Sequence, residues 1–427
     1  MQSVLELYSG LGGHHAAYCL VKGFKTGKEA SAVKFHAYDV NENANDCYAN
    51  NFPDAPSSKD ISLLKASDFD SIGASLWVMS PPCQPYTRNG SRLNSNDARA
   101  HSFINLLQEI SLMTAPPTHI LLENVLGFES SDSFDLLCET LETRYTLQGY
   151  IINPNQCGTP NSRPRFYLLA KIKELSFKCV ANNGKFNNGP GIEIGMPVVE
   201  PNSVSDYLDL KANDDETLFI SHRRLWKAAE QYDILRPSHR RSCCFTKGYG
   251  KFARGTGSVL SMATDEDIIA AAEKYGFDGS EQEGWEEVDG CHLAQVNWDG
   301  VASKNVIRAL KWLFMKYFEL RSKHKPKEDA EDEGKESGAK PKRLSAKRKR
   351  ELDMERGSWP DKLESCPLAA LKLRYFSVKE VSRLQGFPDW FEFPKTLTTE
   401  QGWKLLGNSI NVEIVRGLLL YLLSNSE

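Results

Sequence analysis

The chain has 427 residues, of which 41% are hydrophobic and 25% charged, as in a soluble folded protein of about two domains. Its net charge of −4 excludes a uniformly basic protein, so a nucleic-acid ligand would have to meet a local basic patch. The sequence contains no run of 18 apolar residues, so we expect no membrane span. The N-terminus lacks the pattern of a secretory signal. The ten cysteines lack the spacing of a zinc site, and we expect them to be reduced.

Strand-like and helix-like segments alternate over the first 171 residues. The strand-like runs cover residues 3–9, 35–40, 75–80, 119–125 and 165–172. Between the third and fourth runs, apolar residues at helical spacing predict a helix over 101–113. This alternation predicts an α/β fold with a doubly wound, mostly parallel sheet. Ligands of such sheets bind beyond the carboxyl ends of the strands, and several notable residues fall there: Gly10, Asp39, Cys83 and Glu123.

The regular alternation ends near Lys171, where loops rich in Asn, Gly and Pro begin. We therefore expect one domain over 1–171 and a smaller, irregular domain over 172–365. A C-terminal segment, 366–427, regains order and returns to the first domain. Residues 321–357 contain almost no apolar side chains and are typical of a disordered, charged insert.

A glycine-rich turn, LYSGLGG, follows the first strand and opens a helix. Glycines there let backbone amides approach a ligand closely, although a tight strand-to-helix turn is an equally good explanation. Asp39 ends the second strand, where an acidic side chain can bind ribose hydroxyls or cap the next helix. Together the two features favour a cofactor that contains a nucleoside. The chain has no P-loop lysine, which argues against a nucleotide triphosphatase.

A second group of residues has the chemistry of a nucleophilic site. Cys83 follows the third strand behind two prolines that restrict its backbone. A thiol reacts as its thiolate, and arginines such as Arg163 and Arg165 would raise the thiolate fraction. Glu123 ends a buried strand and could donate a proton to a ring nitrogen. Taken singly, each has an ordinary explanation as a buried thiol, a surface arginine or a helix cap.

The order of these motifs is more specific than any one of them. With SPPCQPYTR, LLENVLGF, GTPNSRPRFYLLAK, CCFTKGYGKFARGTGSVL, RLQGFP and GNS in that order, the chain resembles cytosine-5 methyltransferases that use S-adenosylmethionine. The resemblance covers residues 4–171 and 366–427. It is greatest to the branch that looks like DNA methyltransferases but modifies tRNA, which the CFT tripeptide at 244–246 marks. Thr87 and Asn161 stand where bacterial DNA enzymes carry serine and glutamine, in agreement with that branch.

The resemblance implies a Rossmann-like methyltransferase fold and a covalent mechanism without a metal. Cys83 would attack C6 of a target cytosine, and Glu123 would bind N3 and the exocyclic amine. Arg165, with Arg163, would contact O2 and favour the thiolate. The residues implied to hold S-adenosylmethionine are Leu11, Gly12, Gly13, Asp39, Asp60, Ile61, Ser80, Asn408, Ser409 and Asn411.

The resemblance also implies that residues 172–365 recognise the target, a cytosine at position 38 in the anticodon loop of aspartate tRNA. The residues implied to contact RNA, whose charged members could equally be solvated surface groups, are Arg88, Cys244, Thr246, Lys247, Lys251, Arg254 and Arg374. A DNA cytosine-5 methyltransferase is the alternative. A non-catalytic nucleic-acid-binding protein is a third hypothesis, against which the complete set of site residues argues.

A basic run from Lys340 to Arg350, KPKRLSAKRKR, has seven basic residues in eleven. Such a run is typical of a nuclear localisation signal, an RNA-binding arm or a solvated linker. From these features we expect a monomer that is present in cytoplasm and nucleus.

Overall fold

The computed structural model describes residues 3–82, 101–179, 186–188, 190–280, 298, 302–324 and 366–424. Cys83, Thr87, Arg88 and the basic run 340–350 lie outside the described residues. The described chain forms two compact units, each of which is assembled from separate stretches of sequence.

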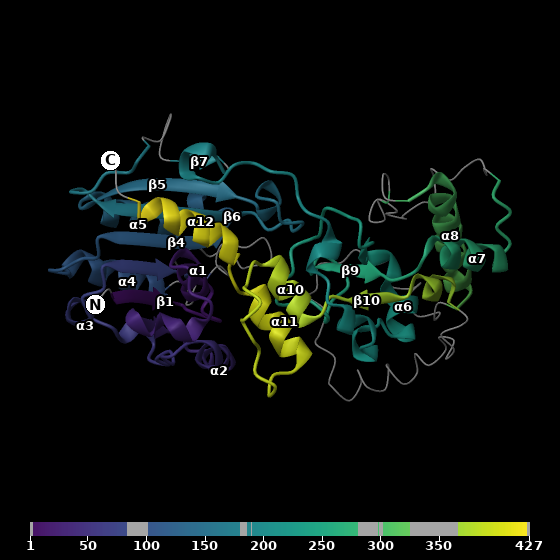
Figure 1. The fold of residues 1–427 in the computed structure, drawn as a ribbon, viewed down its shortest axis with the longest axis horizontal. Helices are drawn as coiled ribbons and strands as arrows, with labels where there is room; N and C mark the ends of the chain where they lie inside the picture. Colours follow the sequence, from purple (N-terminus) through teal and green to yellow (C-terminus); the bar gives the residue numbers. More distant parts are fainter. Residues whose placement is uncertain are drawn as a thin grey trace, which may run out of the picture. The chain divides into compact units, whose positions relative to one another are not determined.

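A seven-stranded sheet is the centre of the first unit (Figure 1). Its strands, in spatial order, are β2 (Lys34–Tyr38), β1 (Ser3–Leu7), β3 (Leu76–Met79), β4 (His119–Val125), β6 (Arg165–Ile172), β5 (Tyr145–Ile152) and β7 (Phe186–Asn188). Strands β2, β1, β3 and β4 are parallel, whereas β6 is antiparallel to both β4 and β5. The predicted doubly wound, mostly parallel sheet is confirmed.

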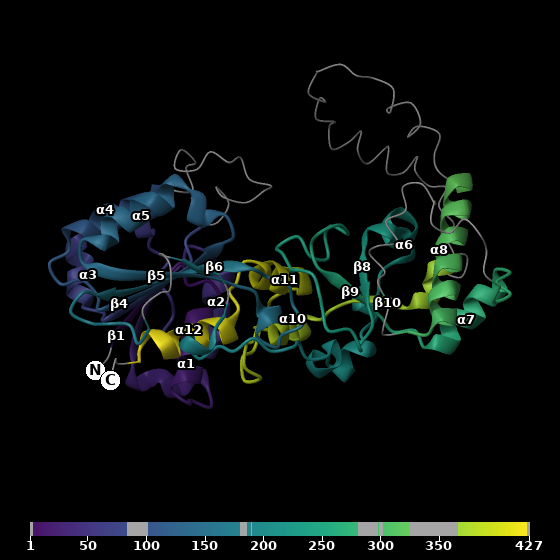
Figure 2. The same ribbon diagram turned by 90° about the horizontal axis from the view of Figure 1, so that it is seen from above.

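Helices cover both faces of this sheet. The helices of the first unit are α1 (Gly13–Val21), α2 (Glu42–Asn51), α3 (Ala66–Ile72), α4 (His101–Leu112), α5 (Asp132–Glu142), α10 (Val378–Leu384), α11 (Thr399–Gly407) and α12 (Val412–Leu422). Figure 2 shows α3, α4 and α5 on one face and α1 and α12 on the other. Because both faces are covered, the central strands are apolar on both sides; β3, for example, is LWVM and fully buried.

The C-terminal segment returns to the first unit, as expected from the sequence, and α12 packs against α1. The stretch Thr399–Leu422 is long and apolar enough to cross a membrane by composition. Residues 408–411 separate α11 from α12, however, and 61% of the most apolar window is buried inside the protein. The stretch therefore has the burial of core helices.

The boundaries between the units differ from those expected. The first unit comprises Met1–Asp209, His239–Phe252 and Ser377–Glu427, and the second comprises Leu210–Ser238 and Ala253–Phe376. Residues beyond 171 stay with the first unit because β7 pairs with β5 and because Met196 packs against Gly417 in α12. A break in regular alternation thus marked the end of the predictable pattern and not the end of the domain.

The second unit contains a small sheet and three described helices. Its strands, in spatial order, are β10 (Leu373–Tyr375), β9 (Ser258–Ser261) and β8 (Asp233–Leu235). Its helices are α6 (His222–Ala228), α7 (Asp265–Lys274) and α8 (Lys304–His324). The expectation that a disordered insert begins at residue 321 is wrong, because α8 continues to His324. Arg321 in its last turn is held by Glu230, at 2.6 Å between Nη1 and Oε1.

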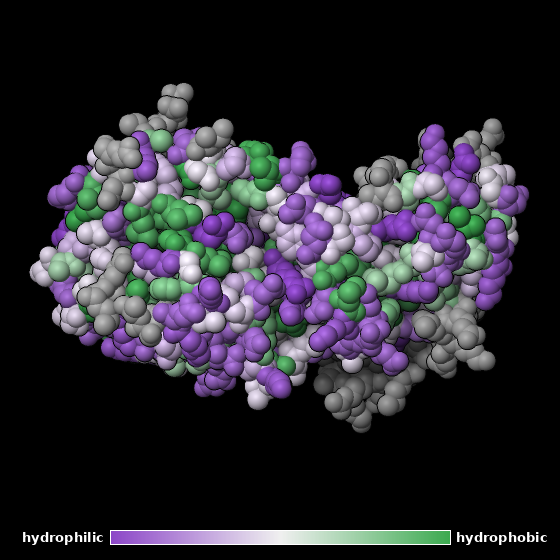
Figure 3. Space-filling model, viewed as in Figure 1, coloured by the Kyte–Doolittle hydropathy of each residue, from purple (hydrophilic) through white to green (hydrophobic). Residues whose placement is uncertain are grey.

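The surface carries apolar side chains in separate patches among hydrophilic ones on the face shown in Figure 3. Single exposed apolar residues are ordinary on a soluble protein. Two of them adjoin functional parts of the first unit: Val40 lines the pocket described next, and Phe252 ends the stretch that carries the CFT tripeptide.

Candidate active site

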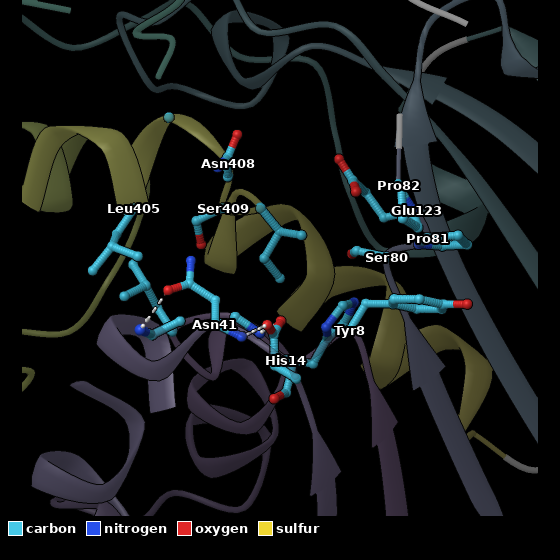
Figure 4. A pocket seen from close by; sticks show the side chains of 18 of the residues that line it. Tyr8, His14, Asn41, Ser80, Pro81, Pro82, Glu123, Leu405, Asn408 and Ser409 are labelled. Atoms are coloured by element: carbon cyan, nitrogen blue, oxygen red, sulfur yellow. Dashed lines mark hydrogen bonds between the residues drawn. The ribbon is translucent and has the colours of Figure 1, made fainter. Parts of the chain in front are cut away.

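A cavity of about 300 Å³ opens where the carboxyl ends of β1, β2, β3 and β4 meet (Figure 4). The strand order reverses between β1 and β3, and ligands of open α/β sheets bind at such a switch point. Six of the residues predicted to hold the cofactor line this cavity: Leu11, Gly13, Asp39, Ser80, Asn408 and Ser409. The predicted catalytic residues Glu123, Arg163 and Arg165 line it as well.

Four other predicted cofactor residues are not among those that line the cavity. Gly12 has φ +83°, and a Cβ atom there would lie 2.5 Å from the Phe52 ring, so this glycine permits close packing. Asn411 caps α12 by accepting a hydrogen bond from the Ile414 amide at 3.0 Å.

The remaining two, Asp60 and Ile61, lie in a neighbouring turn. Asp60 is exposed and accepts a hydrogen bond from the Ser62 amide at 2.9 Å, which caps a short 3-10 helix. Ile61 is buried in the hydrophobic core. The structure therefore gives these two residues capping and packing roles.

Asp39 joins the glycine turn to the end of β2. Its carboxylate accepts hydrogen bonds from the amides of Gly10 and Asn41, both at 2.8 Å. Burial raises the pKa of Asp39, and the two amide donors act in the opposite direction. The cap of α2 is Asn41, which accepts from the Ala44 amide, so the alternative role of Asp39 as a helix cap is excluded.

The cavity wall has the polarity that a nucleoside cofactor needs. Among the described residues, Ser9 Oγ, Ser80 Oγ and His14 Nε2 are buried without a hydrogen-bond partner, and all three residues line the cavity. Figure 4 shows His14 and Ser80 on the wall together with Tyr8 and Asn41. Unpaired buried polar atoms are costly, and a ligand with hydroxyl, amino and carboxylate groups could pair with them. The residues present thus fit S-adenosylmethionine.

Arg163 is a buried clamp, only 2% exposed. Its guanidinium donates to the carbonyl oxygens of Phe245 at 3.1 Å and Gly407 at 3.3 Å, and also to that of Ser409. Burial, followed by the charge of Arg165, lowers the pKa of Arg163. By these bonds Arg163 holds the C-terminal wall of the cavity in place.

Arg165, at the start of β6, faces a different partner. Its Nε lies 3.3 Å from Oε1 of Glu123 on the adjacent strand β4. Both side chains are largely buried, at 14% and 9% exposure, so the contact between them is largely shielded from water. The predicted pair of arginines is therefore brought to one site, with separate roles.

Cys244 lies beside these arginines and not on an open surface. Its Sγ accepts a hydrogen bond from Arg163 Nη1 at 3.3 Å. Burial acts to raise the pKa of this thiol, but the charges of Arg163 and Arg165 outweigh it, and the net pKa is lowered from 9.0. A direct RNA contact was predicted for Cys244, whereas the structure makes it a partner of the arginine clamp.

The remaining predicted RNA contacts differ in accessibility. Lys247, Lys251 and Arg254 are exposed, whereas Thr246 is half-buried and accepts from the Gly248 amide at 3.3 Å. The prediction for Arg374 is wrong. This residue of β10 is 0% exposed, and its guanidinium donates to the Tyr375 carbonyl and to Asn213 Oδ1.

Sequence reasoning missed several residues of the cavity wall. Tyr8 and His14 flank the glycine turn, and their position next to it was the available signal. Leu405 and Ile410 come from the C-terminal segment, where no local pattern distinguishes them from other apolar residues. A Cβ atom on Gly13 would lie 2.6 Å from Ile410 Cγ1, so this glycine admits the C-terminal segment to the cavity.

A glycine turn after β1, an acidic end to β2 and a cavity at the switch point define an α/β protein that binds a nucleoside-containing cofactor. The chain belongs to the family of C-5 cytosine-specific DNA methylases, whose pattern matches residues 2–422. Membership in this methyltransferase family implies methylation that depends on S-adenosylmethionine. It confirms the resemblance and the expectation of an enzyme.

Individual relatives match over nearly the whole chain. The chain is 30% identical to the DNA (cytosine-5)-methyltransferase of Dictyostelium discoideum, over 99% of this chain and 95% of that protein. It is also 30% identical to the tRNA (cytosine(38)-C(5))-methyltransferase of Schizosaccharomyces pombe, over 98% of this chain and 96% of that protein.

Solved structures agree with this grouping. A mutant form of Spodoptera frugiperda DNMT2 matches with a TM-score of 0.67 and 26% identity, over 99% of this chain and 100% of the other. The S. pombe Dnmt2 methyltransferase matches with a TM-score of 0.63 and 28% identity, over 99% and 98%.

Proposed function

We propose that this protein methylates C5 of a cytosine in tRNA, at position 38 of the anticodon loop, with S-adenosylmethionine as methyl donor and aspartate tRNA as the preferred substrate. The observation that carries the proposal is the Glu123–Arg165 pair on the wall of the cofactor cavity. The wall also contains Pro81 and Pro82, directly before Cys83 in the sequence.

The chemistry assigned to these residues addresses the weak nucleophilicity of C5. The Cys83 thiolate forms a bond to C6 of the cytosine, which makes C5 an enamine-like carbon that can accept a methyl group. Bound S-adenosylmethionine supplies an electrophilic methyl group. Loss of the C5 proton to a base and cleavage of the S–C6 bond then regenerate the thiolate and leave 5-methylcytosine.

Glu123 and Arg165 hold the base during these steps. Addition at C6 pushes electrons toward N3 and O2, so a proton donor at N3 and a cation at O2 stabilise the transition state. The carboxyl of Glu123 forms hydrogen bonds with N3 and the exocyclic amine of the cytosine, and the guanidinium of Arg165 contacts O2. Their ion pair fixes the mutual position of the two groups before the substrate arrives.

The choice of RNA over DNA is supported by the relatives and by Asn161. The human and mouse relatives are named tRNA (cytosine(38)-C(5))-methyltransferase and match 97% and 98% of this chain, at 29% identity each. Asn161 Nδ2 donates to Ser242 Oγ at 3.0 Å and to the Cys243 carbonyl at 3.1 Å. Asn161 thus anchors the segment that carries the CFT tripeptide, the mark of the tRNA branch.

The test is bisulfite sequencing of tRNA and duplex DNA incubated with the pure protein and S-adenosylmethionine. We expect conversion-resistant cytosine at position 38 of aspartate tRNA, and none with Cys83→Ala. Binding of S-adenosylhomocysteine by Cys83→Ala, within a few-fold of wild type, would show that the variant is folded. Faster methylation of DNA than of tRNA at equal concentration would favour the DNA methyltransferase, which the Dictyostelium relative makes the second candidate.

The proposal extends to location. The basic run 340–350 supports action in the nucleus as well as the cytoplasm, and a fluorescent fusion with this run removed would test its part.

A further inference from the structure

A tight turn, residues 246–252, begins at the threonine that ends the CFT tripeptide. The Tyr249 amide donates to the Thr246 carbonyl at 2.9 Å. The amides of Lys251 and Phe252 both donate to the Gly248 carbonyl, at 3.0 and 3.1 Å. These bonds close the turn on itself and give its last two residues a fixed direction.

This turn is packed tightly against α11. Tyr249 is buried, with its ring centroid 5.0 Å from that of Trp403. Gly250 has φ +75°, and a Cβ atom there would lie 2.3 Å from the Trp403 ring. Only a glycine permits this approach, so the turn packs closely against the helix.

The turn is also joined to the wall of the cofactor cavity. A Cβ atom on Gly407, which lines the cavity, would lie 2.2 Å from the Lys247 amide nitrogen. The turn therefore packs directly behind the cavity wall. The exposed side chains of the turn are thus carried by backbone that contacts the candidate active site.

The turn exposes an aromatic ring and cations to solvent. Phe252 is 59% exposed, and Lys251 Nζ lies 5.4 Å from its ring centroid. Lys247 and Arg254 are exposed on either side in the sequence. Proteins bind unpaired nucleotides by stacking bases on exposed aromatic rings, with cations beside them for the phosphates.

We propose that Phe252 is a stacking platform for an unpaired nucleobase that flanks the target cytosine, with Lys251 on the adjoining phosphate. The inference rests on the proposed RNA substrate and names a contact for it. The hydrogen bonds within the turn fix the backbone that carries the ring, so little backbone entropy is lost when the base docks.

The test uses a synthetic anticodon stem-loop with 2-aminopurine placed at each loop position in turn, because stacking on an aromatic ring quenches this base. We expect the wild-type protein to quench one flanking position and Phe252→Leu not to. Phe252→Leu should weaken binding roughly 5- to 100-fold, and Phe252→Tyr should bind as wild type. Leu112→Ala, at a residue that is 67% exposed on α4, is the matched control and should change neither reading.

Salt dependence separates the ring from the cation. Lys251→Ala should lower the slope of log affinity against log salt by about 0.7, the value for one phosphate contact on a single strand, while Phe252→Leu should leave the slope unchanged. Wild-type-like quenching and affinity in Phe252→Leu would overturn the inference and leave the proposed function standing. Methylation of duplex DNA but not of tRNA by the wild-type protein would instead overturn the proposed function.

Discussion

Arg163 and Arg165 are two residues apart in the sequence and belong to different structures. Arg163 precedes β6 and donates to the carbonyl of Phe245 and, from a second distant stretch, to those of Gly407 and Ser409. Arg165 begins β6 and pairs with Glu123 across the sheet. Arg163 therefore supports the cavity wall, whereas Arg165 is paired with Glu123 in the part of the wall where we propose that the target base binds.

Substitution by lysine should separate these two roles. In Arg163→Lys, the single ammonium group cannot donate to all of the carbonyls that the guanidinium reaches. We therefore expect the free energy of unfolding to fall by about 2–4 kcal/mol, and cofactor affinity to fall as well. Arg165→Lys keeps a charge beside Glu123 and should retain stability and cofactor affinity while methyl transfer drops at least tenfold. Urea unfolding, calorimetric titration with S-adenosylhomocysteine and tritium transfer measure the three quantities. Equal stability of Arg163→Lys and wild type would contradict the clamp role.

The thiol of Cys244 should contribute to stability in a pH-dependent way. Its pKa in the folded protein is lowered below 9.0, chiefly because Arg163 and Arg165 outweigh the effect of burial. Between the folded and unfolded pKa values the unfolded state binds more protons, so stability rises with pH. Relative to Cys244→Ala, the wild type should gain stability as pH rises toward 9 and lose it as pH falls through the folded pKa.

Urea unfolding between pH 6.5 and 9 measures this difference. Cys366→Ala is the control with the opposite sign, because burial raises the pKa of Cys366 to about 11. The stability difference between wild type and Cys366→Ala should stay level near neutral pH and fall as pH rises past about 8.5, the pKa of an unfolded thiol. A difference between wild type and Cys244→Ala that stays constant over this range would show that Cys244 remains a neutral thiol.

At the scale of elements, glycines at close approaches connect the C-terminal helices to the rest of the first unit. Gly13 admits Ile410 beneath the cavity, Gly407 admits the turn after the CFT tripeptide, and Gly417 admits Met196. The elements that meet there are far apart in the sequence. At each of these glycines, the Cβ atom of any other residue would clash with the neighbouring segment.

Gly407→Ala should damage both packing and cofactor binding. The added Cβ would meet backbone atoms of Thr246 and Lys247 at 2.2–2.3 Å, and these atoms cannot move without displacing the turn. We expect a loss of about 1–3 kcal/mol in the free energy of unfolding and weaker binding of S-adenosylhomocysteine.

Gly195→Ala is the matched control for this prediction. Its φ is +70°, but a Cβ atom there has nothing within 4 Å, so only backbone strain of about 1 kcal/mol is expected. Cofactor affinity should stay at the wild-type level in this variant. If Gly407→Ala bound the cofactor equally well, the turn would not support the cavity wall.

At the scale of the whole molecule, the chain leaves the first unit and returns to it twice. Residues 239–252 bring Cys244 and the turn to the cavity, and residues 377–427 supply its C-terminal wall. The second unit is made from the intervening stretches. Its assembly from two stretches is the reason that no single boundary in the sequence separates the two.

The charged segment between α8 and β10 should be dispensable for folding. It has almost no apolar residues to bury, so deletion of 325–355 should leave the unfolding transition and cofactor affinity unchanged. If the basic run is a localisation signal, a fluorescent fusion should leave the nucleus while methylation in vitro persists. If it is an RNA arm, tRNA binding should weaken and depend less on salt. A deletion protein that fails to fold would refute the assignment of this segment as a disordered insert.

The sequence by itself determined the strands around the cavity and most of its polar lining. Alternating apolar runs, the glycine turn and Asp39 are local patterns, and a parallel sheet brings the carboxyl ends of its strands to one edge. The strand β5 and the short β7 escaped prediction, because their residues show neither a clear period nor a motif.

Only the tertiary structure decided which partners these residues have. Arg163 meets Cys244 across 81 residues and Gly407 across 244, and no local spacing encodes such a pairing. The same holds for Arg374, which looked like a surface cation but is fully buried and donates to Asn213 Oδ1. Burial and charge pairing depend on every segment that packs around a side chain, and those segments come together only when the chain is folded.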